Sequence, residues 1–186
     1  MKGAADCSRA MRAVQNSTHL FGQESMIRRM AEEDVEAAGQ VWLTASLAAH
    51  DFVPASFWQA DHKTMVSEIL PAAHGYVHET AVAIDGFVAL GSGDRANFMG
   101  ALFVGPDHQS RGIGTRLLDH VKAMRDPLDT SVYKQNHRAF AFYQARGFRV
   151  TGEAICEHTG CGEYTLRWTG NPEPATATDG ADATAE

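Results

Sequence analysis

The fold of this chain is decided by residues 101–115, which read ALFVGPDHQSRGIGT. An apolar run, Ala101 to Val104, passes through Gly105-Pro106 into the glycine-spaced start of an amphipathic segment. This order predicts a strand followed by a helix. The first N–H groups of a helix have no intrahelical partner and its dipole is positive at that end, so glycines there let an anion approach closely. We therefore expect a phosphate-binding turn between strand and helix.

Two common phosphate-binding loops fit this turn poorly. A dinucleotide-binding fingerprint needs a third glycine, where this chain has Leu117, and a P-loop needs Gly-Lys-Ser/Thr, which is absent. Glycines spaced this way also occur in tight turns that only pack a helix onto a sheet. The turn alone therefore leaves open both a phosphate site and a purely structural role.

Helix and strand patterns alternate downstream of the turn. An apolar stripe at spacings of three and four predicts a helix over residues 112–125 that ends before Pro127. Residues 136–146 form a second helical pattern, with Gly147 as its left-handed C-cap. Strands are expected at residues 130–133, 148–153 and 163–168.

The upstream half opens with two helical patterns and continues with strands. Residues 32–49 have one apolar face at helical spacing, and a second helix is expected from Pro54 until Pro71 stops it. Strands are expected at residues 26–30, 76–79, 82–90 and 98–104, the first of them at a sheet edge. The chain thus predicts an α+β order with sequential antiparallel strands.

One turn in this half has two interpretations. The pair Asp85-Gly86 is typical of a two-residue hairpin turn. In the other interpretation Gly86 lies inside a strand and the turn is near Thr80. Local chemistry does not choose between them.

Length and composition indicate one globular domain. The chain has 186 residues, of which 44% are apolar and 21% charged, enough to form a core. It has no run of the ~18 apolar residues that a membrane span needs, so we expect no membrane association. The net charge is −7, and a mildly acidic domain offers no general basic face, so we expect no nucleic-acid partner.

Cysteine usage and the N-terminal residues bear on the compartment. Cys7, Cys156 and Cys161 are an odd number without a disulfide framework, and Arg9 and Arg12 interrupt any secretory signal. We therefore expect a cytoplasmic protein. The sequence leaves open whether the chain forms a homodimer.

A zinc site is the most specific metal hypothesis for this chain. Cys156, His158 and Cys161 lie close together, and His137 is a fourth candidate ligand. They form one loose group without a second C-x-x-C pair, whereas zinc ligands usually come in two clusters. We therefore predict no metal.

The two ends of the chain differ in composition from its middle. Residues 170–186 contain no aromatic or large aliphatic side chain and carry only negative charges, which predicts a disordered acidic tail. Residues 1–25 show no sustained periodicity and are expected to be a poorly ordered extension. The folded domain is then predicted at residues 26–169.

Two spaced motifs connect the chain to a known family. Gln109-x-x-Gly112-x-Gly114 after a strand resembles the acetyl-CoA pyrophosphate signature Q/R-x-x-G-x-G/A of the GNAT acyltransferases. The next helical pattern resembles the family's following helix, Asn136-x-x-Ala139-x-x-Phe142-Tyr143-x-x-x-Gly147-Phe148. Residues 42–52 and 132–152 are similar to the bacterial YjaB-type acetyltransferases. The resemblance implies the GNAT fold, an α+β, αβα-layered architecture whose mixed central sheet is splayed between its fourth and fifth strands.

The resemblance also implies a site for acetyl-CoA as co-substrate. Its pantetheine arm would run along Leu102, Phe103 and Val104 like an added strand. Asn136 would hydrogen-bond that arm, and Tyr143 would point its hydroxyl at the sulfur as a general acid. The pyrophosphate would bind the backbone amides of Gln109, Ser110, Arg111, Gly112, Ile113, Gly114 and Thr115.

The general base is less well defined. Gly100 stands where an acidic residue is expected in this group, so the usual carboxylate is absent. The candidates are His50, Asp51, His78 and Glu79, because they lie on the helix and strand that would flank the acceptor cleft. Among these four we rank Glu79 and His50 first.

The resemblance implies an acetyl-CoA-dependent N-acetyltransferase. Acetyl would pass by direct attack in a ternary complex to a primary amine of a small molecule, a protein lysine or an N-terminus. The alternative function is an acyl-CoA-binding sensor without efficient turnover, which the missing carboxylate at Gly100 allows. The presence of Tyr143, which could act as the general acid, favours the enzyme over the sensor.

Overall fold

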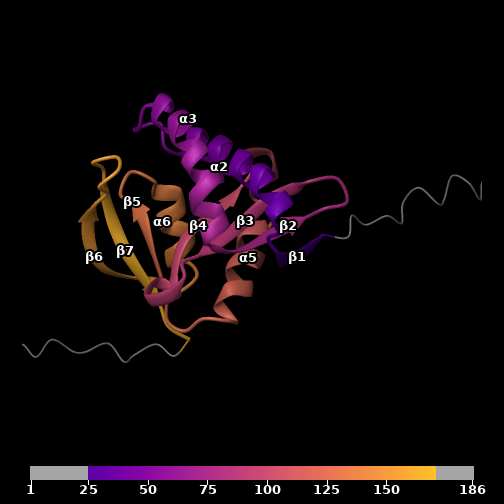
Figure 1. The fold of residues 1–186 in the computed structure, drawn as a ribbon. Coiled ribbons are helices and arrows are strands. Elements are labelled where there is room, and N and C mark those ends of the chain that lie inside the picture. Colours follow the sequence, from indigo (N-terminus) through magenta and orange to yellow (C-terminus); the bar gives the residue numbers. More distant parts are fainter. Residues whose placement is uncertain (1–24, 171–186) are drawn as a thin grey trace, which may run out of the picture.

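The computed structural model describes residues 25–170, so the predictions for residues 1–24 and 171–186 lie outside the described part. A seven-stranded sheet runs through the molecule, with helices on both of its faces (Figure 1). The strands are β1 (Met26–Arg29), β2 (His74–Glu79), β3 (Ile84–Leu90), β4 (Phe98–Val104), β5 (Leu128–Tyr133), β6 (Arg149–Ile155) and β7 (Gly162–Trp168). The main helices are α2 (Val35–Ala49), α3 (Ala55–Thr64), α4 (Leu70–Ala72), α5 (Ile113–Lys122) and α6 (His137–Gln144). Short helical turns are η1 (Glu32–Asp34), η2 (Met65–Ile69), η3 (Gly93–Arg95) and η4 (Pro106–His108).

The strand order is β1-β2-β3-β4-β5-β7-β6, and every neighbouring pair is antiparallel except β4 with β5. These two central strands pair only at Phe98 with Asp129 and at Met99 with Thr130. Beyond Met99 they separate, while β4 stays paired with β3 as far as Val104. The predicted α+β fold with a splay between the fourth and fifth strands is therefore confirmed.

Two hydrophobic cores hold helices against the two faces of the sheet. On one face, Trp42 of α2 and Trp58 of α3 pack with Val77 and Phe87 of the sheet. On the other face, α5 buries its apolar stripe against β3, β4 and β5, and α6 adds Tyr143. The α5 stripe consists of Ile113, Leu117, Leu118 and Val121, each at most 4% exposed. The layered αβα arrangement follows from these two amphipathic helix sets.

The second helical segment is longer than its prolines suggest. Pro71 was expected to end it, but η2 is a π-helical turn and α4 continues to Ala72, with Pro71 in its first turn. The N–H of Leu70 bonds to the carbonyl of Met65, five residues back. The wider turn relieves the clash that a proline ring makes with the preceding turn of a regular α-helix. The expectation that Pro71 stops the helix is wrong for this reason.

The ambiguous hairpin turn is the one near Thr80. The N–H of Thr80 donates to the carbonyl of Ala83 over 2.9 Å, and its hydroxyl donates to the same carbonyl over 3.0 Å. Gly86 lies inside β3, paired with His78 on one side and Val104 on the other. A Cβ on Gly86 would lie 3.1 Å from Ile113 Cγ2 and 3.1 Å from the Phe103 carbonyl oxygen. The missing side chain lets the start of α5 pack directly on the sheet.

This close packing predicts that Gly86→Ala destabilises the protein by about 1–3 kcal/mol, because the added Cβ must displace either α5 or backbone. Chemical denaturation of both proteins measures the difference. Gly100→Ala is the matched control within a strand, since its Cβ would meet only Phe98 ring atoms at 3.9 and 4.0 Å. The control should change the free energy of unfolding by less than about 0.5 kcal/mol. Equal effects of the two substitutions would contradict the packing argument.

Candidate active site

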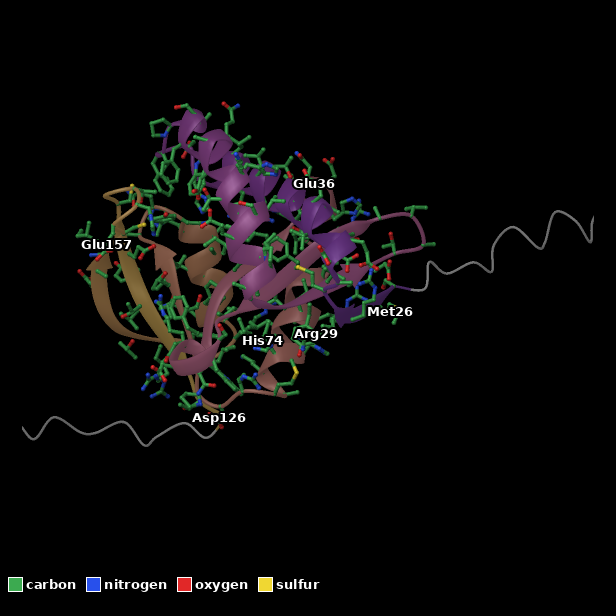
Figure 2. The ribbon with its side chains drawn as sticks, in the orientation of Figure 1. Met26, Arg29, Glu36, His74, Asp126 and Glu157 are labelled. Carbon is green, nitrogen blue, oxygen red and sulfur yellow. The ribbon has the colours of Figure 1, made fainter. Side chains whose placement is uncertain are left out.

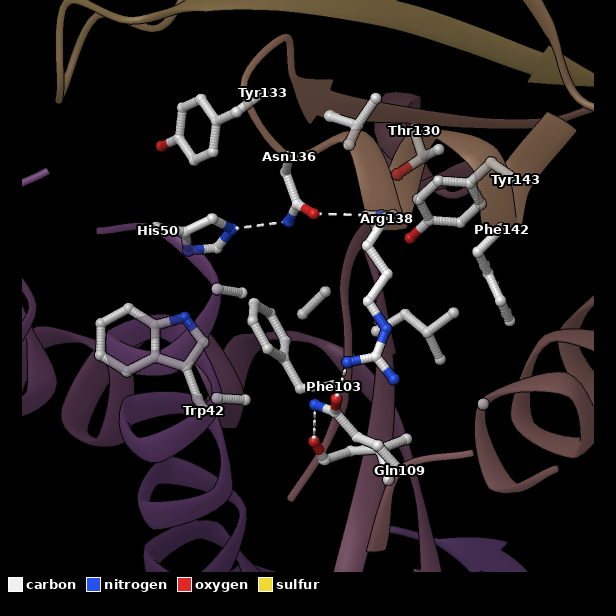
Figure 3. Close-up of a pocket in the computed structure, with 18 of the residues that line it drawn as sticks. Trp42, His50, Phe103, Gln109, Thr130, Tyr133, Asn136, Arg138, Phe142 and Tyr143 are labelled. Carbon is white, nitrogen blue, oxygen red and sulfur yellow. Dashed lines mark hydrogen bonds between the residues drawn. The ribbon is translucent and has the colours of Figure 1, made fainter. Parts of the chain in front are cut away.

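A pocket of about 640 Å³ opens where β4 and β5 separate. It passes through the plane of the sheet, because residues from helices on both faces line it. Trp42, His50 and Trp58 come from the side of α2 and α3, and Phe142 and Tyr143 come from α6. Figure 3 shows Trp42 and His50 across the pocket from Phe142 and Tyr143. The splay therefore joins two half-sites into one continuous space.

The predicted phosphate-binding turn lies at one end of this pocket. Gly112 is the N-cap of α5 with φ +80°, a left-handed conformation that strongly favours glycine, and no side chain of residues 25–170 caps the helix. The first amides of α5 therefore remain available to an anion. Gln109 Nε2 donates to the Val104 carbonyl oxygen over 3.0 Å, which ties the loop to the end of β4.

Two arginines that the sequence analysis missed flank this turn. Arg138 donates to Gln109 Oε1 over 2.7 Å and to Ser110 Oγ over 3.1 Å, and Figure 3 shows its side chain extended from α6 toward Gln109. Arg146 donates to Thr115 Oγ1, and its guanidinium lies 3.9 Å from the centre of the Phe142 ring. Both arginines line the pocket. The two arginines make this end of the pocket positively charged, although the net charge of the chain is negative.

Asn136 and His50 meet across the pocket. Asn136 caps α6, its Oδ1 accepting from the Ala139 N–H over 3.0 Å, and its Nδ2 lies 3.1 Å from His50 Nε2. Burial lowers the pKa of His50 to about 4, so its ring is neutral at pH 7. If Asn136 Nδ2 donates, His50 Nε2 accepts and its proton sits on Nδ1, which is buried without a partner among the described residues. This arrangement orients Asn136 and makes His50 a weak base.

Tyr143 lies at the fork where the two strands part. Its side chain contacts Thr130, whose hydroxyl donates to the Met99 carbonyl over 2.9 Å and so joins β5 to β4 at their last paired residues. The Tyr143 hydroxyl points into the pocket (Figure 3). Burial raises the pKa of Tyr143 to about 12, so the phenol keeps its proton throughout the neutral range.

The α2 side of the pocket is aromatic and carries one carboxylate. The His50 ring lies 5.1 Å from the Trp58 ring and 5.2 Å from the Tyr133 ring, centre to centre. Glu163 of β7 pairs directly with Tyr133 of β5 and also lines the pocket. The sequence analysis did not single out Glu163, because nothing local shows that β7 lies beside β5.

Comparisons with known proteins agree with this geometry. Residues 46–168 match the family model described as an acetyltransferase (GNAT) domain. The chain belongs to the GNAT acetyltransferase family. Peptidyl-lysine N-acetyltransferase YiaC of Escherichia coli (strain K12) is 30% identical over 143 residues, 77% of this chain and 96% of the relative.

Two solved structures share the GNAT fold of this chain. YjaB from Escherichia coli, in its apo form, has a TM-score of 0.69 at 31% identity, and the match covers 79% of this chain and 99% of the YjaB chain. The PaiA N-acetyltransferase from Thermoplasma acidophilum, in complex with coenzyme A, has a TM-score of 0.67 at 17% identity and covers 78% and 99%. The predicted resemblance to the GNAT family and to YjaB-type members is confirmed.

The cofactor residues predicted for the GNAT domain are mostly brought together. Arg111 is exposed and is not among the pocket residues. Gly100 lies in the pocket and contributes no side chain. The predicted residues that do line the pocket are Leu102, Phe103, Val104, Gln109, Ser110, Gly112, Ile113, Gly114, Thr115, Asn136 and Tyr143.

Three of the four candidate bases lie outside the pocket of the GNAT domain. Glu79 accepts from Arg28 over 2.7 and 3.0 Å, an ion pair that lowers the pKa of its carboxyl. His78 is buried with its Nδ1 2.5 Å from Asp85 Oδ1, and Asp51 is exposed. In the sheet, β3 separates β2 from β4, so side chains at the end of β2 are remote from the splay. Of the four, only His50 lines the pocket.

The potential zinc ligands of the GNAT domain do not converge. Within residues 25–170, no group of three or more His, Cys, Asp or Glu side chains is placed to hold a metal ion. Cys156 instead lies 3.5 Å from the Tyr133 hydroxyl, and its N–H donates to the Cys161 carbonyl across the β6–β7 turn.

Within residues 25–170, no helix is both long and apolar enough to cross a membrane.

Proposed function

We propose that this protein transfers an acetyl group from acetyl-CoA to the side-chain amine of a protein lysine. The observation that carries the proposal is the pocket through the splayed sheet, with the bare N-terminus of α5 at one end and the Tyr143 hydroxyl pointing into it. Such a passage lets a thioester reach the fork from one face while an amine approaches from the other.

The cationic end of the pocket fits the phosphates of coenzyme A. Among the described residues, nothing lies within 4 Å of a Cβ on Gly112, so an anion has room beside the unpaired first amides of α5. Arg138 and Arg146 supply charge beside those amides. These amides and guanidinium groups are therefore suited to bind the negative charge of a pyrophosphate.

The arm of the cofactor fits the edge of β4. From Ala101 to Val104 this strand pairs with β3 but not with β5, so its other edge has no strand partner among the described residues and can pair with an extended amide-bearing chain. When bound, acetyl-CoA would supply an activated acetyl group as a thioester. Backbone N–H groups of this free edge would stabilise negative charge that develops on the acetyl oxygen. Tyr143 would donate its proton to the departing thiolate.

A lysine acceptor is favoured by the relatives and by the chemistry of the α2 side. YiaC is a peptidyl-lysine acetyltransferase. Trp42, Trp58 and Tyr133 form an aromatic wall that suits the alkyl part and charge of a lysine side chain. A small amine or a protein N-terminus would use the same entry.

The decisive experiment incubates the purified protein with acetyl-CoA and a panel of lysine peptides, N-terminal peptides and small amines. We expect thiol release with lysine peptides and a mass increase of one acetyl group on lysine. Peptides whose lysine is already acetylated are the control and should release no thiol. Tight binding of acetyl-CoA without turnover on any acceptor would instead support the sensor function.

Arg138 provides a separate prediction about cofactor binding. Arg138→Ala should weaken coenzyme A binding by roughly 10- to 100-fold, since a charge-assisted hydrogen bond contributes about 1.5–3 kcal/mol. Isothermal titration calorimetry measures the change. Arg149→Ala on exposed β6 is the matched control and should bind normally. Unchanged affinity of Arg138→Ala would show that this guanidinium only fastens the loop.

A further inference from the structure

The pocket holds one carboxylate that the resemblance does not assign. Glu163 lies on β7 opposite Tyr133 of β5, and Ser131, two residues before Tyr133 on β5, hydrogen-bonds its carboxyl. Neighbouring positions on paired strands share a face, so these three side chains project to the same side of the sheet. Tyr133 packs with the α2 core, which identifies that side. Glu163 therefore reaches the pocket from the acceptor side.

We propose that Glu163 is the general base that removes a proton from the acceptor ammonium. This inference rests on the proposed function and deepens it, because it names the group that makes the lysine nucleophilic. The carboxylate that the family resemblance leads one to expect at Gly100 is absent, and Glu163 brings a carboxylate to the same pocket from a different strand.

The positions of Glu163 and Tyr143 suit opposite ends of one reaction. Tyr143 comes from α6, on the α5 side of the sheet, and Glu163 projects toward α2. Because the amine adds and the thiolate leaves from different directions at the acetyl carbon, a base on one face and an acid on the other match the two proton transfers. The ammonium loses one proton to Glu163, its nitrogen lone pair bonds to the acetyl carbon, the carbon–sulfur bond breaks and sulfur takes the Tyr143 proton. The nitrogen then releases its second proton, which restores the Tyr143 phenol, and Glu163 releases its proton to solvent before the next turnover.

The surroundings of Glu163 agree with this role. Burial raises the pKa of its carboxyl, while the Ser131 hydrogen bond and His158 act in the opposite direction. A raised pKa makes a carboxylate a stronger base. Tyr133 from β5 and His50 at the end of α2 are titratable groups on this side of the pocket, and burial keeps both uncharged at pH 7. His108 of η4 also lines the pocket, and Cys156 contacts the Tyr133 hydroxyl. The nearby Lys134 is paired with Glu153.

Glu163→Gln is the direct test, because it keeps the shape and the oxygen that accepts from Ser131 but removes the basic group. With a lysine peptide at pH 7.5 we expect kcat to fall by roughly 100-fold. Coenzyme A affinity and melting temperature should stay close to those of the parent. Glu157→Gln removes the same charge from the same hairpin; its carboxylate is exposed on the outer side (Figure 2), so it should keep parental activity.

The pH profile separates a base from a structural residue. The parent should lose activity as pH falls through the Glu163 pKa and reach a plateau above that pKa. Glu163→Gln should have no plateau: its residual rate should rise up to about tenfold per pH unit toward the lysine pKa of ~10.4, because it depends on amine already deprotonated in solution. A structural role would leave the shape of the profile unchanged.

Each outcome decides the inference. Glu163→Gln within about threefold of the parent, with the parental pH profile, would overturn it. If Glu163→Gln fails to fold, Glu163→Asp serves instead: we expect a lowered kcat with the acidic limb retained, and an unchanged kcat would count against the role. A parent that acetylates no lysine, N-terminal or small-molecule amine would refute the proposed function itself, a result distinct from an active Glu163→Gln.

Discussion

Tyr143→Phe should reduce acetyl transfer by roughly 10²- to 10⁴-fold while coenzyme A still binds with near-parental affinity. The substitution removes only the hydroxyl at the fork of β4 and β5 and keeps the ring, which packs against Phe142 and Phe148. Burial holds the pKa of Tyr143 near 12, so the phenol is protonated at every pH at which the protein would work. No alkaline fall in rate from this group is expected below about pH 11.

The measurement is the single-turnover rate with a lysine peptide, because slow product release can mask a change in chemistry. Tyr164→Phe is the control, since Tyr164 packs on Phe140 and does not line the pocket. It should leave the rate unchanged. If Tyr143→Phe turns over within about threefold of the parent in the chemical step, Tyr143 is a packing residue and solvent supplies the proton.

The Gly112→Val, Gly114→Val double variant should lose at least about tenfold in coenzyme A affinity. Gly112 has φ +80°, which costs a branched residue about 1–3 kcal/mol, so the start of α5 must rearrange. Gly114 is different: its Cβ would lie 3.6 Å from the Phe142 ring and 3.7 Å from Val104, an ordinary contact. Alanine should therefore be tolerated at Gly114, whereas valine narrows the pocket.

Gly93→Val is the matched control for backbone strain. Gly93 also has a positive φ, +57°, and no atom of residues 25–170 lies within 4 Å of its Cβ, but it lies in η3 outside the pocket. It should lower stability and leave coenzyme A binding intact in calorimetry. Undiminished binding by the double variant would show that the phosphates bind elsewhere.

Several parts of the fold and site could be read from local chemistry. The apolar run before Gly105, the start of the helix next to Asn136 and the left-handed Gly147 all appear where predicted. Each depends on residues close together in the chain, through periodicity, capping or a required φ. Recognition of the GNAT motifs rested on the same short-range spacing.

The sequence did not locate the remaining site residues, because they depend on which strands become neighbours. Glu79 and Glu163 are both carboxylates on strands, yet β3 keeps Glu79 from the splay, where it pairs with Arg28. Glu163 reaches the pocket because β7 lies between β5 and β6 in the sheet, directly beside β5. The sequence gives no sign of either arrangement at the residues concerned.

By itself, then, the sequence determined the order of helices and strands, the glycine-rich turn before α5 and the family, and it singled out Tyr143 as a candidate acid. The tertiary structure decided the rest: that β4 and β5 part after Met99, that Arg138 reaches Gln109, that Asn136 meets His50 and that Glu163 enters the pocket. The physical reason is range. Helix starts and turns are set by neighbours a few residues away, whereas the charges and proton carriers of this site come from segments up to about a hundred residues apart, which only sheet pairing and helix packing bring together.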